Sequence, residues 1–390
     1  MPYYYVYLIF INKNRFVKIA FVANTSWNIY NFRRNLIIRL LDKGHKIICI
    51  APEDEFTGEI QRLSITFIPI TIHAKGNNPL TDFLLLKQLT KIYKNHKPDM
   101  IFQYTIKPNI YGTFAARIAG IPTINTVTGL GTVFLHNNIV SKVAQKLYAI
   151  SFKYARFVVF QNEEDKQLFI QKKIVDASKT HVIRGSGVDT TFFKASASHS
   201  VETIFRFVMA ARLIFDKGIA EYAAASKELF TIYGKSVECI LIGAVDSDKN
   251  FGIRKEDLNT WVAQHKLIYK SFSKQIVLEY QHATAVVLPS YREGLSKSLL
   301  EAASCSKPLI TTNVAGCKDI VVDGKNGFLC EPKDTQDLFV KMKKMIQLSK
   351  GELIDMGNYS RQLVEENFSD KIIFNDYFCL INKIATKETK

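Results

Sequence analysis

Short apolar runs alternate with longer amphipathic stretches along most of the chain. In the first half, the apolar runs predict strands near residues 17–23, 46–51, 65–70, 99–103, 122–126 and 157–161. The stretches between them carry apolar residues at helical spacing, and they predict helices near residues 30–43, 81–96, 109–119, 138–154 and 163–172. This alternation is typical of a parallel sheet with helices on both faces.

The second half repeats the pattern, which predicts two α/β domains. Its strands are expected near residues 205–210, 238–243, 267–270, 284–288, 308–312 and 327–329, with a last helix near 370–386. The small polar residues of 194–200 are typical of a linker. We therefore predict a first domain over 17–193, a linker over 194–204, a second domain over 205–368, and a final helix and tail over 369–390.

Residues 1–16 fit neither domain. Their apolar part is too short to span a bilayer, and it lacks the basic beginning and small-residue cleavage site of a secretory signal. We expect the fold to begin at Val17. The segment is interpreted as the product of an upstream start codon, with an interfacial flap as the alternative.

Composition narrows the class of protein. The chain has 390 residues, of which 47% are hydrophobic and 23% charged, as in ordinary globular proteins. No apolar run reaches the ~18–20 residues of a membrane span. The six cysteines are scattered, without a Cys-x-x-Cys motif or histidines at zinc spacing, so we expect a reduced cytoplasmic protein without a metal site.

Charge is shared unevenly between the halves. Residues 1–200 carry a net charge of +14 and residues 201–390 a net charge of +2. The first half should therefore have an anionic partner, and because no nucleic-acid-binding motif is present, an anionic membrane is favoured over nucleic acid. Lys142, Lys146 and Lys153 recur at nearly helical spacing among apolar residues, which suits a membrane surface. An internal apolar stripe with solvated lysines explains the same spacing equally well.

Two glutamates follow a predicted strand of the second half. Glu293 lies in a turn after Pro289, and Glu301 falls in the second turn of a helix that should begin near Ser296. A helix start offers unpaired N–H groups and a positive dipole end, which suit phosphate. The carboxylates are suited to holding sugar hydroxyls, so the segment predicts a nucleotide-sugar site. Taken alone, this spacing is more often solvated surface.

Two cations flank the turn that follows the strand near 205–210. Arg212 and Lys217 precede Gly218. Arginine forks onto a diphosphate and lysine adds a compact charge, so together they could neutralise a leaving diphosphate without a metal. An ordinary solvated turn explains this segment about equally well when it is seen alone.

Taken together, these segments resemble the donor domain of family 4 glycosyltransferases. The resemblance rests on Arg212-Leu-Ile-Phe-Asp-Lys-Gly218, on the Pro-Ser-x-x-Glu-Gly turn with a second glutamate eight residues later, and on Val322-Asp-Gly-Lys-Asn-Gly-Phe-Leu329, where Asn326-Gly327 predicts a hairpin turn. It implies a GT-B fold, in which two Rossmann-like parallel-sheet domains face each other across a cleft and a C-terminal helix crosses back to domain one. It also implies transfer with retention of anomeric configuration.

The first half resembles one branch of that family. The segments Lys107–Pro122 and Thr126–Phe134 are similar to those of enzymes that build capsule, O-antigen and glycoprotein glycans on a polyprenyl diphosphate. The resemblance implies a UDP-sugar donor, a hexose or N-acetylhexosamine as the transferred sugar, a polyprenyl-diphosphate-linked saccharide as acceptor, and a peripheral location on the cytoplasmic face of the inner membrane. The resemblance also implies that the reaction needs no metal cofactor.

Further positions are assigned with their structural alternatives. Gly243 lets the donor approach the backbone or merely ends a strand, whereas Gly294, Leu295 and Ser296 would offer amides to the diphosphate. Contacts with the acceptor are expected near strand ends and at a helix start. Two of these residues have a structural alternative: Trp27 could only close the cleft, and Asn109 could only cap a helix. These acceptor residues are Thr25, Ser26, Trp27, Asn109, Thr128, Gly129 and Gly131.

Two departures from the family pattern limit the resemblance. Threonine stands at position 128 near the place where many members have a histidine, so no acceptor-side histidine is assigned. Lys270 begins the predicted base-binding turn where a glycine is frequent, so uridine is expected by analogy alone.

The predicted roles follow from charge development. Arg212 and Lys217 would stabilise the departing diphosphate, Glu293 would orient the sugar and Glu301 would hold the ribose. Two alternatives remain: a GT-B nucleotide-sugar epimerase or hydrolase, and a non-catalytic glycan- or lipid-binding relative. A dinucleotide oxidoreductase is disfavoured because no Gly-x-Gly-x-x-Gly motif follows the first strand.

Overall fold

A computed structural model describes residues 16–73, 78–130, 134, 139–196, 204–245, 252–271 and 275–386. Most of the 1–16 extension, most of the 194–204 linker and the candidate residue Gly131 therefore lie outside the described residues. The chain divides into two compact units. One comprises the described residues up to Ile124 together with those from Phe378, and the other is Asn125–Tyr377. The domain boundaries expected from the sequence stay a prediction.

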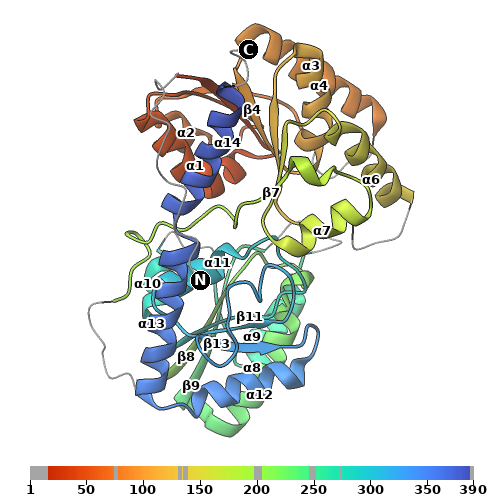
Figure 1. The fold of residues 1–390 in the computed structure, drawn as a ribbon. Helices are drawn as coiled ribbons and strands as arrows, with labels where there is room; N and C mark the ends of the chain where they lie inside the picture. Colours follow the sequence, from red (N-terminus) through yellow and green to blue (C-terminus); the bar gives the residue numbers. More distant parts are fainter. Residues whose placement is uncertain are drawn as a thin grey trace. The chain divides into compact units, whose positions relative to one another are not determined.

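A seven-stranded parallel sheet occupies the first half, in the order β3-β2-β1-β4-β5-β6-β7 (Figure 1). Its strands are β1 Lys18–Val22, β2 Lys46–Ala51, β3 Thr66–Pro69, β4 Met100–Tyr104, β5 Thr123–Val127, β6 Phe157–Phe160 and β7 Thr180–Val182. Its helices are α1 Ser26–Asp42, α2 Thr57–Gln61, α3 Pro79–His96, the π-helix η1 Pro108–Gly112, α4 Thr113–Ala119, α6 Ile139–Phe152, α7 Glu163–Gln171 and the 3-10 turn η2 Ala177–Lys179. The six expected strands are confirmed to within about a residue at each end, whereas β7 was not predicted.

The second half forms a six-stranded parallel sheet in the order β10-β9-β8-β11-β12-β13. Its strands are β8 Phe205–Ala210, β9 Val237–Ile242, β10 Ile268–Lys270, β11 Ala285–Leu288, β12 Leu309–Thr312 and β13 Gly327–Cys330. The helices are η3 Phe215–Lys217, α8 Ile219–Tyr233, η4 Gly234–Ser236, α9 Lys255–Gln264, α10 Ile276–His282, α11 Lys297–Ser304, α12 Thr335–Ile346, α13 Lys350–Asn367 and α14 Asp370–Ala385. In Figure 1, α8, α9 and α12 cover one face of this sheet, and α10, α11 and α13 cover the other.

Both sheets reverse their strand order at one place. The reversal falls between β1 and β4 in the first sheet, and between β8 and β11 in the second. Parallel α/β sheets bind ligands beyond the carboxyl ends of the strands at such a reversal. The topology therefore marks the segments that follow these four strands as candidate binding positions.

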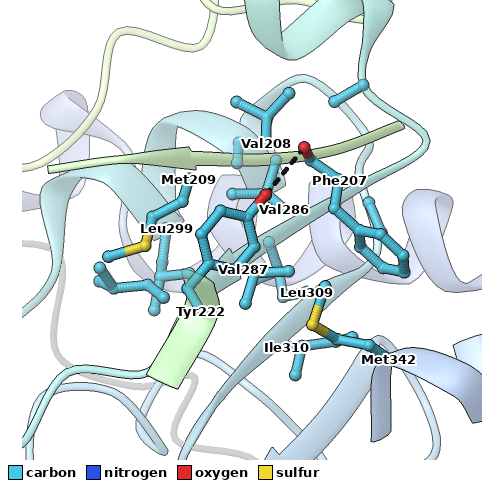
Figure 2. Close-up of a cluster of buried hydrophobic side chains, with 14 of the residues drawn as sticks. Phe207, Val208, Met209, Tyr222, Val286, Val287, Leu299, Leu309, Ile310 and Met342 are labelled. Carbon is cyan, nitrogen blue, oxygen red and sulfur yellow. Dashed lines mark hydrogen bonds between the residues drawn. The ribbon is translucent and has the colours of Figure 1, made fainter. Parts of the chain in front are cut away.

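Buried side chains from strands and helices form the core of the second sheet (Figure 2). Phe207 and Met209 of β8 pack with Val286 and Val287 of β11, and Tyr222 of α8 closes the cluster. The Tyr222 hydroxyl donates a hydrogen bond to the Phe207 carbonyl oxygen at 3.0 Å. This bond satisfies a buried polar group, as burial requires, and it joins α8 to the strand that ends at the candidate site.

One turn differs from the prediction. A hairpin was expected at Asn326-Gly327, but Gly327 begins β13, which runs parallel to β12. The chain turns earlier, at Gly324, where φ is +77°. The buried Asn326 side chain instead ties the segment together, because its Oδ1 accepts from the Val322 amide at 2.7 Å and its Nδ2 donates to the Ile320 carbonyl oxygen at 3.0 Å.

The last helix returns to the first half of the chain, as the GT-B resemblance implies. The residues of α14 from Phe378 onward belong to the same compact unit as the first strands. The Phe378 ring lies 6.1 Å from the His45 imidazole, between centroids.

Candidate functional site

The turn that carries Lys217 is fastened to the segment that follows β11. The Tyr291 amide donates to the Asp216 carbonyl oxygen at 2.8 Å, and the Ser290 hydroxyl donates to the same oxygen at 3.1 Å. The Tyr291 hydroxyl in turn donates to Glu221 at 2.6 Å. Since η3 follows β8, these bonds join the two segments on either side of the strand-order reversal.

Lys217 and Glu293 meet at this junction. The Lys217 Nζ contacts Glu293 Oε1 as an ion pair. The side chains are only 16% and 14% exposed, so solvent screens the pair less than a surface salt bridge. Two of the four predicted charged residues are thus brought together at the carboxyl edge of the sheet.

Glu301 lies in the second turn of α11, as predicted. Ser296 is the N-cap of this helix, and its hydroxyl accepts from the Leu299 amide. Burial raises the pKa of Glu301, and Lys297, whose Nζ lies 3.5 Å from the carboxylate, opposes the shift. Glu301 therefore holds a proton to higher pH than an ordinary glutamate does.

Arg212 and Gly243 follow the adjacent strands β8 and β9. Arg212 is exposed, and its guanidinium makes no hydrogen bond or ion pair with the described residues. It lies at the same sheet edge as Lys217 and Glu293. Gly243 has a structural requirement of its own, because a Cβ there would come within 2.0 Å of the Ala211 carbonyl oxygen. A donor contact at Gly243 stays a prediction.

The backbone around Gly294 is closely packed. A Cβ on Gly294 would lie 2.3 Å from the Thr128 carbonyl oxygen, and one on Gly129 would lie 3.3 Å from the Gly294 amide nitrogen. Two predicted acceptor residues therefore lie against a predicted donor residue. The Gly294 and Leu295 amides make no hydrogen bond with the described residues, whereas the Ser296 amide donates to the Gly316 carbonyl oxygen at 3.0 Å. The first two amides are the available donors of this turn.

An ion pair with one buried partner braces the Glu293 segment, and the sequence does not predict it. Arg292 Nη2 lies 2.5 Å from Asp165 Oδ1, and the Asp165 side chain is only 1% exposed. Burial raises the pKa of Asp165, which Arg292 opposes. The side chain of Asn162, the N-cap of α7, also donates to the Gly294 carbonyl oxygen at 2.7 Å. Arg292 stands inside the recognised motif, but nothing in the sequence indicates its partner 127 residues away.

The predicted acceptor residues after β1 have structural partners. Thr25 is the N-cap of α1 and accepts from the Asn28 amide at 3.0 Å. The buried Ser26 donates to the Pro52 carbonyl oxygen at 2.7 Å, and the Trp27 amide donates to Asp54 at 2.8 Å. Trp27 keeps a half-buried indole. Acceptor contacts from these three residues stay predictions.

Asn109 is fully buried in η1, and no side chain caps that helix start. The capping alternative for Asn109 is therefore wrong, and its acceptor role stays a prediction. Within the described ranges, no three His, Cys, Asp or Glu side chains gather in a way that could hold a metal ion. None of the helices that the structure describes has the length and apolar content needed to cross a bilayer.

Two parallel α/β sheets, with the Lys217–Glu293 ion pair at the strand-order reversal of the second, are typical of proteins with the GT-B fold. A family model described as glycosyl transferases group 1 matches residues 192–363, and one described as glycosyl transferase 4-like matches residues 18–162. The chain belongs to these glycosyltransferases.

Two curated relatives and one solved structure are similar to this chain over about two thirds to nearly all of its length. The N,N'-diacetylbacillosaminyl-diphospho-undecaprenol alpha-1,3-N-acetylgalactosaminyltransferase of Campylobacter jejuni is 27% identical over 94% of this chain and 99% of its own. The UDP-Gal:alpha-D-GlcNAc-diphosphoundecaprenol alpha-1,3-galactosyltransferase of Escherichia coli is 28% identical over 65% of this chain and 68% of its own. Anabaena Alr3699/HepE, solved with UDP and glucose, shares the fold with a TM-score of 0.79 at 19% identity, over 94% of this chain and 100% of its own.

Proposed function

We propose that this glycosyltransferase moves a hexose or N-acetylhexosamine from a UDP-sugar to a polyprenyl-diphosphate-linked saccharide, with retention of anomeric configuration. The observation that carries the proposal is the contact between Lys217 and Glu293 at the strand-order reversal of the second sheet. Opposite charges at that point give one position for a diphosphate and an adjacent one for a sugar.

The leaving group would be stabilised by charges already in place. As the bond between the anomeric carbon and the diphosphate oxygen breaks, negative charge develops on UDP. Lys217 and the exposed Arg212 supply cations, and the Gly294 and Leu295 amides supply dipoles. Preorganised groups of this kind lower the barrier without reorganisation during the reaction.

The carboxylates would hold the two sugars of the donor. Glu293 orients hydroxyls of the transferred sugar, and Glu301 accepts hydrogen bonds from the ribose. The acceptor hydroxyl attacks the anomeric carbon on the face from which UDP departs, and its proton passes to the departing phosphate oxygen. Because attack and departure occur on the same face, configuration is retained without a protein nucleophile.

The relatives' names support the substrate classes. Both curated relatives act on saccharides linked through a diphosphate to undecaprenol, and one name states a UDP-galactose donor. These names favour a role in assembling a glycan on undecaprenyl diphosphate, and the resemblance noted from the sequence extends that role to capsule, O-antigen or glycoprotein glycans.

Helix α6 supports a peripheral location on the cytoplasmic face of an anionic inner membrane. Its outward face exposes Ile139 by 80%, Val143 by 53% and Ile150 by 38%. Lys142, Lys146 and Lys153 are also exposed along or just beyond this helix. Apolar residues beside lysines suit the interface of an acidic bilayer.

A screen of UDP-, GDP- and dTDP-sugars against a short polyprenyl-diphosphate saccharide tests the proposal, with the product linkage determined by NMR. We expect one UDP-sugar to give an acceptor-linked product whose anomeric configuration matches the donor, with or without a metal chelator. An inverted product, or a strict requirement for a GDP- or dTDP-sugar, would refute the proposed reaction. Loss of activity with the chelator would refute metal independence.

A further inference from the structure

Arg33 occupies a core position of helix α1. The buried face of this helix is otherwise formed by small or apolar side chains, with Ile29, Leu36, Ile37 and Leu40 at helical spacing around it. Arg33 is 1% exposed, whereas its neighbour Arg34 is exposed. Two adjacent arginines on one helix therefore have opposite environments.

The buried guanidinium has few partners. Its carbon lies 3.9 Å from the centroid of the Tyr104 ring, so a cation–π contact holds it in place. Arg33 Nε and Nη1 are buried and have no hydrogen-bond partner among the described residues, and no described carboxylate pairs with Arg33. A buried cation without a counter-charge destabilises a fold. This cost points to an anion that completes the arrangement.

The position in the fold agrees with ligand binding. Tyr104 is the last residue of β4, and β1 and β4 flank the strand-order reversal of the first sheet. Thr105, which follows, has φ of +70°, a strained conformation for a β-branched residue. The π-helix η1 begins three residues later, and π-helices recur at functional sites.

A nearby cation is already neutralised. Lys107 lies 2.7 Å from Asp82, both side chains are 12% exposed, and the Tyr111 hydroxyl also donates to Asp82. Lys107, in the segment after β4, is thus paired, whereas Arg33, whose guanidinium lies over Tyr104 at the end of β4, is not. The difference singles out Arg33 as the cation suited to an added anion.

We propose that Arg33 binds phosphate oxygens of the acceptor's diphosphate, at the carboxyl edge of the first sheet. The assignment of the anion to the acceptor rests on the proposed function, but the anion site itself does not. The Nε and Nη1 groups carry N–H donors that phosphate oxygens accept strongly, because both partners are charged.

The direct test titrates inorganic diphosphate into the full-length protein saturated with UDP, by calorimetry. UDP fills the donor site, so the remaining binding reports a second site. We expect Arg33→Met to weaken this binding by about ten-fold or more, the value of a lost charge-assisted bond. The matched variant Arg34→Met should keep the wild-type affinity. Absence of diphosphate binding to the wild type, or equal binding by Arg33→Met, would overturn the proposal.

Thermal unfolding gives an independent readout. Arg33→Met removes an unpaired buried charge, so the ligand-free variant should melt above the wild type and lose the upward shift that diphosphate gives. If Arg33→Met does not fold, Arg33→Lys keeps the charge but not the planar group, and it should still weaken diphosphate binding by about ten-fold. A normal affinity in a folded Arg33→Lys would then contradict the site.

Kinetics distinguish the source of the anion. With acceptor, Arg33→Met should raise the acceptor KM by about ten-fold and leave the donor KM unchanged. An unchanged acceptor KM would remove the assignment to the acceptor. Arg33-dependent diphosphate binding in a protein that transfers no sugar would refute the proposed function and retain the anion site.

Discussion

At the residue scale, the contact between Lys217 and Glu293 gives each side chain a fixed position. A lysine has much rotamer freedom in water, and the pairing removes it before a ligand arrives. Both side chains keep some exposure, so ligands can reach them. A bound diphosphate could then replace Glu293 as the partner of Lys217, and sugar hydroxyls could replace Lys217 as the partner of Glu293. The residues can therefore be truncated without leaving a deeply buried charge.

Lys217→Ala and Glu293→Gln should each lower kcat by about 10²–10³, the effect of removing one preorganised electrostatic group. Circular dichroism and the melting temperature should stay close to those of the wild type. Lys318→Ala breaks the more exposed ion pair with Glu164 and serves as the control, with normal turnover expected. Near-normal turnover of either site variant would contradict these roles.

Glu301 gives a prediction for pH dependence. Burial raises the pKa of Glu301, so its carboxylate becomes protonated at a higher pH than an ordinary glutamate does. The donor KM should therefore begin to rise at that higher pH on acidification, because the protonated carboxyl binds the ribose less well. Glu301→Gln should raise the donor KM by about ten-fold at neutral pH, the value of a hydrogen bond to a charged group, and remove this acid limb.

The same shift has a consequence for stability. Because the pKa of Glu301 is raised in the folded state, the protonated carboxyl stabilises the fold. This contribution to the free energy of unfolding is complete below the pKa of the unfolded chain, and it is lost as the pH rises through the pKa of the folded protein. At neutral pH, ligand-free Glu301→Gln should therefore melt no lower than the wild type. A lower melting temperature at neutral pH would show that the ionised carboxylate stabilises the fold.

We expect the pair of Asp165 and Arg292 to position the neighbouring Glu293. Arg292→Met and Asp165→Asn should each reduce kcat by about ten-fold or more because the adjacent carboxylate loses its fixed position. Glu163→Gln, an exposed change on the same helix, is the control. A purely structural pair would lower the melting temperature in both variants and leave the kcat of the folded protein unchanged.

At the element scale, the exposed face of helix α6 is proposed to contact an acidic bilayer. Its buried residues include Tyr148 and Phe152, so the apolar residues on its other face are not needed for the core. Lys142 and Lys146 adjoin that face. An acidic bilayer would bury the apolar side chains and attract the lysines.

Lys142→Glu combined with Lys146→Glu should weaken binding to vesicles containing phosphatidylglycerol by more than ten-fold, since each lysine near such a surface contributes about 1 kcal/mol. Val143→Ser should also weaken binding. Val340→Ser changes a residue of similar exposure on α12 and should have no effect. Sedimentation with vesicles measures the change, and unaltered sedimentation of the charge variant would exclude α6 as the docking element.

Elements with a strong local signal could be predicted from the sequence. The buried strands of both sheets read as apolar runs, and the start of α11 was evident from Ser296. The sequence pattern predicts the beginning of α1 four residues late, because the apolar periodicity does not mark Thr25 as its cap. β7 is a three-residue edge strand in which only Thr180 is buried, so it carries almost no periodic signal.

The site was predictable in its charged residues but not in their bracing. Lys217 and Glu293 were expected near one ligand, and the structure brings them into contact. The Asp165–Arg292 pair depends on a tertiary contact that no local pattern encodes. Arg33 did leave a signal, because it interrupts the apolar stripe of Ile29, Leu36 and Leu40 at a core position.

At the scale of the whole molecule, the six-stranded sheet repeats the order of the first six strands of the seven-stranded sheet, and cationic side chains lie near each reversal point. In the second sheet the cations are Lys217 and Arg212, and in the first the unpaired cation is Arg33. The two proposals together therefore give each sheet one position for a phosphate. A transferase that moves a sugar from one diphosphate-bearing substrate to another needs two such positions, whereas a donor hydrolase or epimerase needs one.

The most direct test of this account measures donor consumption with and without acceptor, in the wild type and in Lys217→Ala. We predict that wild-type protein releases UDP and forms the acceptor-linked product in equal amounts when the polyprenyl-diphosphate saccharide is present. Release should be negligible without it, and Lys217→Ala should reduce both products together. UDP release that does not depend on the acceptor would indicate a hydrolase, and an isomerised donor would indicate an epimerase. A protein that consumes no donor would be a binding protein. Each of these three results would contradict the proposed transfer.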